Sequence, residues 1–156
     1  MPDEIGFFKV RPLRAEDVSR LAEIDAVSNI PSWTRGMFER ELELPISLSA
    51  VAVHNEIPVA FGIAWTVGDT AQLHQIAVSE NYRRNGVGRL ILKDLFESAR
   101  RRGCGKMELE LRKGNEPARF LYEKMGFKIN GERKGFYEKV GSLQSEDAVL
   151  MSCELK

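Results

Sequence analysis

The sequence predicts one α/β domain, in which a mixed and mostly antiparallel sheet is flanked by about four helices. Three observations lead to this prediction. Several short β-type runs follow one another through tight turns, so most neighbouring strands are expected to pair as hairpins. One long amphipathic helix lies between two strands and predicts a strand–helix–strand crossover. The 156 residues suffice for a single domain over residues 1–156 with a sizeable core, and hardly for two.

The first 44 residues are expected to form a short strand followed by two helices. "FFKVRPL" (7–13) has the apolar content of the strand. "RAEDVSRLAEIDAVS" (14–28) places apolar residues on one helical face, and its Glu16 and Asp17 suit the positive end of a helix dipole. A proline interrupts the pattern before "TRGMFERELEL" (34–44) resumes it, which predicts the second helix.

Three β-type runs come next and predict the hairpins of the sheet. They are "SLSAVAVHN" (47–55), "IPVAFGIAWTV" (57–67) and "DTAQLHQIAV" (69–78). The first two flank the turn "HNEIP", and a turn at Gly68–Asp69 precedes the third. We therefore expect consecutive strands joined by hairpin turns in the middle of the chain.

The clearest element is a helix from about Val87 to Arg102. Its apolar face follows the i, i+3, i+4, i+7 spacing and comprises Gly88, Ile91, Leu92, Leu95, Phe96 and Ala99. Arginines 100–102 favour its C-terminal end, where the helix dipole is negative, and Gly103 is expected to end it.

The last third of the chain is expected to hold one more helix among three strands. "KMELELR" (106–112) alternates strictly between apolar and polar residues, as a strand does. "NEPARFLYEKM" (115–125) predicts a helix with Asn115 as N-cap and Gly126 as its stop. The chain then continues into strands over 127–138 and 146–155, joined by a loop over 139–145.

Composition and charge exclude several classes of protein. Lysine plus arginine equals aspartate plus glutamate, so the net charge is zero, which argues against broad nucleic-acid binding. Cys104 and Cys153 have no metal-type spacing, so we predict neither a metal site nor a disulfide framework. Residues 1–10 carry acids where a signal peptide needs positive charge, and no stretch approaches the ~20 apolar residues of a membrane span. We expect a cytoplasmic protein with no membrane partner.

The stretch "ENYRRNGVGRLILKDL" (80–95) predicts an anion site. A strand that runs into a loop and then a helix exposes unpaired N–H groups at the positive end of that helix. Gly86 and Gly88 let the backbone approach a ligand closely, and Arg83, Arg84 and Arg89 add positive charge. The pattern is neither a P-loop nor a Rossmann loop. The alternative is that the glycines only form a tight turn and pack the helix against the strand.

Four segments resemble known acetyltransferases. "IAVSENYRRNGVGRLIL" (76–92) resembles the acetyl-CoA-binding motif of the GNAT superfamily of N-acetyltransferases, and the order of elements resembles the GNAT acyl-CoA N-acyltransferase fold. "ELELRKGNEPARFLYEKMGF" (108–127) is similar to the LEVRxxNxxAxxLYxxxGF pattern of the ribosomal-protein-alanine N-acetyltransferase group. "IPSWTRGMFEREL" (30–42) and "SEDAVLM" (145–151) are similar to that group's PWSxxxFxxEL and EDAxxM stretches.

The chain departs from that group at two places. Ser32 is inserted before Trp33, where the group has Pro-Trp directly, and Phe136 stands where a tyrosine is usual. Both places fall in regions that the resemblance expects to touch the acceptor.

The resemblance implies a binding site for acetyl-CoA. The strand would contact the pantetheine arm through the backbone of Ile76, Ala77 and Val78. The pyrophosphate would be held by Arg84, Asn85, Gly86, Val87, Gly88 and Arg89. Asn115 would contact the coenzyme as well as cap its helix.

Acetyl transfer to an amine needs a neutral nitrogen and a proton for the departing thiolate. An α-amine has a pKa of about 8, so roughly a tenth is neutral at pH 7 and a weak base suffices. Alternation alone favours a solvated face for Glu108 and Glu110, whereas the resemblance implies that Glu110 is the base, directly or through water. Pattern alone makes Tyr122 a core tyrosine, and the resemblance implies that it is the acid. His74 and His54 are weaker candidate bases.

Three functions remain to be distinguished. The leading hypothesis is an acetyl-CoA-dependent N-acetyltransferase that acts on a protein N-terminus, by resemblance the N-terminal alanine of a small-subunit ribosomal protein. A GNAT enzyme acting on a small-molecule amine or a lysine is the second. A module that binds acyl-CoA without catalysis is the third.

Overall fold

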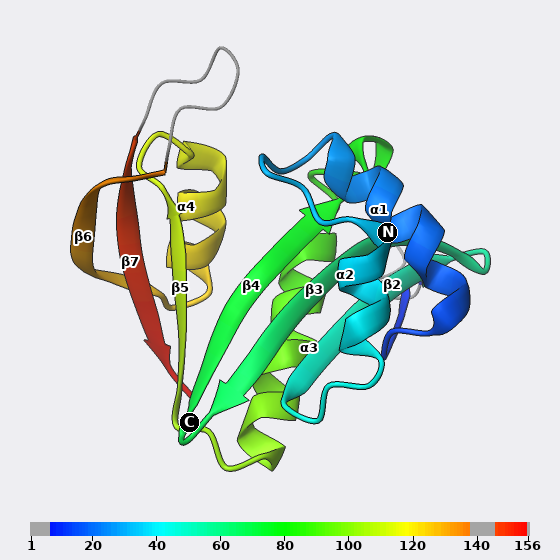
Figure 1. The fold of residues 1–156 in the computed structure, drawn as a ribbon, viewed down its shortest axis with the longest axis horizontal. Coiled ribbons are helices and arrows are strands. Elements are labelled where there is room, and N and C mark those ends of the chain that lie inside the picture. The colour runs from blue at the N-terminus through cyan, green and yellow to red at the C-terminus, as the bar shows by residue number, and fades with distance from the viewer. Residues whose placement is uncertain (1–6, 138–145, 156) are drawn as a thin grey trace.

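The computed structural model describes residues 7–137 and 146–155, which form a seven-stranded sheet in the order β1-β2-β3-β4-β5-β7-β6 (Figure 1). The strands are β1 (Lys9–Arg11), β2 (Ser47–His54), β3 (Ile57–Val67), β4 (Thr70–Val78), β5 (Lys106–Arg112), β6 (Lys128–Tyr137) and β7 (Glu146–Glu154). The helices are α1 (Val18–Ala26), α2 (Arg35–Glu41), α3 (Val87–Arg101) and α4 (Glu116–Lys124), with short 3₁₀ turns at Ala15–Asp17 and Glu80–Tyr82. Every neighbouring pair is antiparallel except β4 and β5. The predicted mixed, mostly antiparallel sheet with four helices is confirmed.

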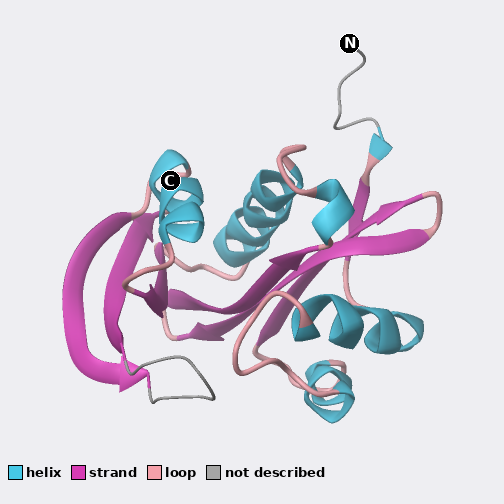
Figure 2. Ribbon diagram, turned by 90° about the horizontal axis from the view of Figure 1, so that it is seen from above, coloured by secondary structure: helices cyan, strands magenta, loops and turns pink. Residues whose placement is uncertain are grey.

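The helices cover both faces of the sheet. Helices α3 and α4 lie on one face, and α1 and α2 lie on the other (Figure 2). The buried residues of α3 are those of the predicted apolar face, with Val87 in place of Gly88. Two apolar clusters result, one between the sheet and α3 and the other between the sheet and α1 with α2.

The sequence analysis predicted one helical crossover, and the structure has two. Helix α3 joins the parallel pair β4 and β5, as expected. Helix α4 makes the second crossover, because β7 inserts between β5 and β6 and pairs antiparallel with both. The predicted loop over 139–145 lies outside the described residues.

Strands β4 and β5 pair over a short stretch and then diverge. Thr70–Gln72 face Lys106–Glu108 in parallel register, and no pairing continues beyond them within these two strands. On its other edge, β4 carries a bulge: Leu73 and Gln75 pair with neighbouring residues of β3, which leaves His74 as the extra residue. A bulge bends its strand and increases the local twist. The upper part of β4 therefore turns away from β5 (Figure 1).

A buried carboxylate ties α1 and the segment after it to β4. Asp25 is fully buried in α1. Its Oδ1 accepts from the Asn29 side-chain amide at 2.6 Å, and its Oδ2 accepts from the Trp33 backbone N–H at 2.6 Å and from Gln75 of β4 at 2.7 Å. The Asn29 amide also donates to the Ile76 carbonyl at 3.1 Å. Residues 29–33 are thus held over β4 at the point where it leaves β5.

In the part of the chain that the structure describes, no helix is long and apolar enough to cross a membrane.

We predict that Asp25→Ala destabilises the protein by about 3–5 kcal/mol, because three partly buried donors lose their fully buried acceptor at once. Urea unfolding followed by circular dichroism measures the change. Glu23→Ala is the matched control on the same helix, since the Glu23 side chain is largely exposed and its change should stay within about 0.5 kcal/mol. Equal unfolding midpoints for the two variants would contradict the role of Asp25.

Candidate active site

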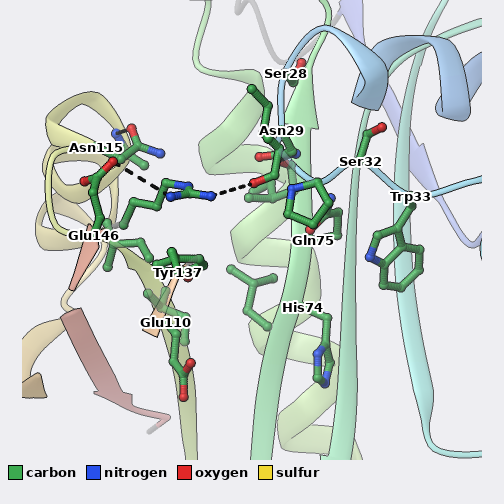
Figure 3. A pocket seen from close by; sticks show the side chains of 18 of the residues that line it. Ser28, Asn29, Ser32, Trp33, His74, Gln75, Glu110, Asn115, Tyr137 and Glu146 are labelled. Carbon is green, nitrogen blue, oxygen red and sulfur yellow. Dashed lines mark hydrogen bonds and ion pairs between the residues drawn. The ribbon is translucent and has the colours of Figure 1, made fainter. Parts of the chain in front are cut away.

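A cavity of about 610 Å³ opens where β4 and β5 diverge (Figure 3). Residues 74–76 of β4 and 109–112 of β5 form two of its walls. Asn115, Ala118 and Tyr122 of α4 close one end, and residues 28–33 close the other. Tyr137 and Glu146, at the facing ends of β6 and β7, complete it.

The cavity connects the two faces of the sheet. Leu109 and Leu111 are buried in the cluster that contains α3 and Tyr122. Glu110 and Arg112 project from the opposite face of the same strand, toward the segment that follows α1. The predicted alternation of β5 is therefore confirmed. Because of it, alternate residues of this strand line the cavity on the two faces of the sheet.

Glu110 lines this passage and is also partly exposed to solvent. About a third of its side chain is exposed (32%), and its Oε1 is 3.5 Å from a guanidinium nitrogen of Arg133 on β6. Glu110 also lines an adjoining cavity of about 420 Å³. Glu108 lines only that second cavity and lies 3.7 Å from Lys106. Of the two carboxylates, Glu110 alone reaches the main cavity.

Tyr122 lies at the opposite end of the passage and is buried. Its ring packs edge-on against Phe127, with centroids 5.6 Å apart. Burial raises the pKa of its phenol far above the ordinary value, and the nearby Tyr137 raises it further. The phenol is therefore protonated at neutral pH and is able to donate. Tyr122 is thus a core residue that also lines the cavity.

The loop before α3 has the backbone of a tight turn. Arg84 and Gly86 both have positive φ, at 66° and 77°, and Gly86 is the N-cap of α3. No atom lies within 4 Å of a Cβ built on Gly86, whereas one built on Gly88 would be 3.1 Å from Leu121 of α4. Gly86 thus serves the turn, and Gly88 serves the close packing of α3 against α4. Neither role uses the N–H groups of the first helical turn, which have no partner within the helix.

The predicted coenzyme residues fall into two groups. Ile76 and Asn115 line the cavity, and Asn115 also caps α4 by accepting from the Ala118 N–H at 3.3 Å. Ala77, Val78 and residues 84–89 do not line it and follow it along the chain from the end of β4 to the start of α3. The Val87 side chain is buried, so it offers a ligand its backbone only. The side chains of Arg84 and Arg89 are exposed.

The sequence analysis missed Arg112 and its partners. The Arg112 guanidinium lies over the Tyr137 ring, 4.5 Å from the centroid. It donates to the Ile30 carbonyl at 3.4 Å and lies 3.9 Å from Glu146, so it spans the cavity. Alternation along β5 places Arg112 on the same face as Glu110, and this pattern could have predicted that Arg112 lies at the site. The contact with Ile30, 82 residues away, leaves no local signal.

Other predicted residues have mixed outcomes. His74 lines the cavity, but its ring packs on Trp65 at 4.1 Å and burial lowers its pKa. Ser32 and Trp33 line the cavity at the first departure from the resembling group. Phe136, at the second departure, is exposed and does not line it, whereas its neighbour Tyr137 does.

Within residues 7–137 and 146–155, no group of three or more His, Cys, Asp or Glu side chains could hold a metal ion.

Comparison with known proteins places this geometry in a family. The chain matches the Acetyltransferase (GNAT) family over residues 18–127. It is 34% identical to ribosomal protein bS18-alanine N-acetyltransferase of Haemophilus influenzae, over 94% of this chain and 98% of that protein.

Solved structures agree. The ribosomal-protein-S18-alanine N-acetyltransferase from Escherichia coli aligns with a TM-score of 0.85 at 28% identity, over 96% of this chain and 94% of that one. A GNAT family acetyltransferase from Elizabethkingia anophelis with acetyl-CoA bound shares the fold, with a TM-score of 0.75 at 21% identity over 96% and 99% of the two chains. The family match and the relative that is 34% identical along nearly its whole length show that this protein belongs to the GNAT family and is an N-acetyltransferase.

Proposed function

We propose that this enzyme transfers the acetyl group of acetyl-CoA to the N-terminal amine of a protein, and that its acceptor is the N-terminal alanine of a small-subunit ribosomal protein. The observation that carries the proposal is the passage through the sheet, which brings Glu110 and Tyr122 to a single cavity from opposite sides. The relatives named as bS18-alanine N-acetyltransferases support the choice of acceptor.

Acetyl-CoA enters on the face covered by α3 and α4. The pyrophosphate lies against the N–H groups of residues 86–89 at the positive end of α3, with Arg84 and Arg89 beside it. Beyond Gln72 the edge of β4 has no pairing with β5, so an extended pantetheine arm can lie along the backbone of Ile76, Ala77 and Val78. Two carbonyls there already accept from side chains, Ile76 from the Asn29 amide and Val78 from the Arg83 guanidinium. The arm then leads to the cavity, where Asn115 and Tyr122 stand.

The acceptor amine enters from the face covered by α1 and α2. Its neutral nitrogen attacks the thioester carbonyl, and an amide bond forms as the carbon–sulfur bond breaks. Glu110 accepts the proton that the nitrogen loses, directly or through water, and Tyr122 donates a proton to the departing thiolate. The products are an acetylated N-terminus and coenzyme A.

The chemistry favours an α-amine over a lysine side chain. The pKa of an α-amine lies about 2.4 units below that of a lysine, which is worth about 3.3 kcal/mol in the supply of neutral nucleophile. Glu110 is a partly exposed carboxylate paired with Arg133, and such a weak base suffices for an α-amine.

We predict that the purified enzyme acetylates an Ala-starting peptide from the ribosomal protein at its N-terminus. Mass spectrometry with fragmentation identifies the acetylated nitrogen. The same peptide with a blocked N-terminus and an internal lysine should give no product. If calorimetry shows that acetyl-CoA binds while the Ala-starting peptide stays unmodified and a small-molecule amine reacts, the protein-acceptor proposal is wrong.

We predict that Glu110→Gln and Tyr122→Phe each lower kcat about 10²- to 10⁴-fold, because each removes one proton-transfer step. The affinity for coenzyme A, measured by calorimetry, should stay close to that of the wild type. Glu108→Gln is the matched control, since this neighbour on the same face of β5 does not reach the main cavity. Wild-type turnover in either test variant would assign the proton transfer to another group.

We predict that Arg89→Gln weakens coenzyme A binding about 10-fold through the loss of a charged contact to the pyrophosphate. Arg101→Gln, at the other end of the same helix, should leave the affinity unchanged, because its side chain is exposed and contacts Glu97 at 4.0 Å and Ser98 at 3.4 Å. Calorimetric titration measures both. Equal dissociation constants for the two variants would move the pyrophosphate away from the start of α3.

A further inference from the structure

The main cavity holds a buried cation that the proposed mechanism does not use. The Arg112 side chain is only 15% exposed. Its Nη1 is enclosed and has no hydrogen-bond partner among the described residues. A buried charged donor without an acceptor is costly, and native proteins rarely keep one. The position therefore calls for an acceptor atom that a ligand would supply.

The neighbouring groups fix the Arg112 guanidinium in place but offer no hydrogen-bond acceptor to its Nη1. The Tyr137 ring lies beneath it, and its Nη2 donates to the Ile30 carbonyl. The nearest carboxylate oxygen, Oε1 of Glu146, is 3.9 Å from Nη1, beyond hydrogen-bond distance. The other oxygen of Glu146 accepts from the Gly114 N–H at 3.0 Å, which fixes that side chain.

The cation stands on the acceptor side of the passage. Arg112 and Glu110 project from the same face of β5, and Arg112 reaches the segment after α1. Two residues along a strand span about 6.8 Å. This spacing allows one side chain to bind the amine of an extended peptide while the other binds the carbonyl next to it.

The charge balance favours a neutral oxygen as the partner. Among the described residues, the charged groups facing this part of the cavity are Arg112 and Arg133 against Glu110 and Glu146, which cancel. The Tyr137 phenol is neutral, since burial raises its pKa and Glu110 raises it further. An added anion would meet two carboxylates, whereas a peptide carbonyl accepts the hydrogen bond without adding charge.

We propose that Arg112 is an acceptor-binding residue whose Nη1–H donates to the backbone carbonyl oxygen of the acceptor's first residue. This bond fixes the α-amine beside Glu110. It also gives the enzyme a means of selecting peptides, because the amine of a lysine side chain or a simple alkylamine has no carbonyl at that distance. The inference rests on the proposed protein acceptor and adds the group by which that acceptor is recognised.

The test pairs two substitutions, one in the enzyme and one in the acceptor. The acceptors are an Ala-starting peptide and its analogue in which an (E)-alkene replaces the first amide, so that the carbonyl oxygen is lost and the shape is kept. We expect the wild type to prefer the amide peptide in kcat/KM by about 10- to 100-fold. In Arg112→Gln, kcat/KM for the amide peptide should fall by that factor, whereas kcat/KM for the alkene peptide should change little. The ratio of the two values should therefore fall to about one.

Controls separate this role from a structural one. Arg101→Gln should keep the wild-type preference, and coenzyme A affinity and Tm show whether Arg112→Gln remains folded. Arg112→Lys keeps the charge without the two-pronged geometry and should show an intermediate preference; it replaces the glutamine variant if that one does not fold. An equal loss on both acceptors, or no loss on the amide peptide, would overturn the proposal. A wild type that acetylates neither peptide would instead overturn the protein acceptor itself.

Discussion

The short parallel pairing of β4 and β5 is the constraint on which the site depends. Three residues of each strand share a ladder, and the bulge at His74 then turns β4 away. A continuous sheet would seal the two faces from one another. Here side chains replace the absent ladder, through the Asn29 amide on the Ile76 carbonyl and the Arg112 guanidinium on the Ile30 carbonyl. The cavity between the two strands connects the two faces of the sheet.

Position within this passage separates the two groups proposed for proton transfer. Glu110 stands on the open side, partly exposed and close to Arg133, where a carboxylate remains in contact with water. Tyr122 stands on the closed side among apolar residues, where burial keeps the phenol protonated. Strand β5 and helix α4 thus hold the proposed proton acceptor and the proposed proton donor in environments that suit each task.

Local patterns in the sequence predicted the helices and strands, but they did not predict the long-range contacts. The alternation of β5, the apolar face of α3 and the Asn115 cap of α4 depend on neighbours a few residues apart, and the structure confirms all three. The return of β7 between β5 and β6 depends on pairing between distant segments, which no local pattern records.

The candidate site was predicted in the same uneven way. The roles of Glu110 and Tyr122 came from the resemblance, because alternation and helical spacing alone favoured a solvated acid and a core tyrosine. The Asp25 network was missed because its partners at Trp33 and Gln75 meet only in the fold.

The two proposed binding regions come from different parts of the chain, which has an evolutionary consequence. The coenzyme region contains Arg84, Gly86 and the start of α3, and the acceptor region contains residues 28–33 and Tyr137. The Arg83 guanidinium donates to Ser28 Oγ at 3.2 Å and so joins the loop that precedes α3 to the proposed acceptor-facing segment. Mutations in residues 29–33 can accumulate without disturbing the loop as long as this bond is kept. A duplicated gene could therefore exchange one acceptor for another in few steps while it keeps the same donor.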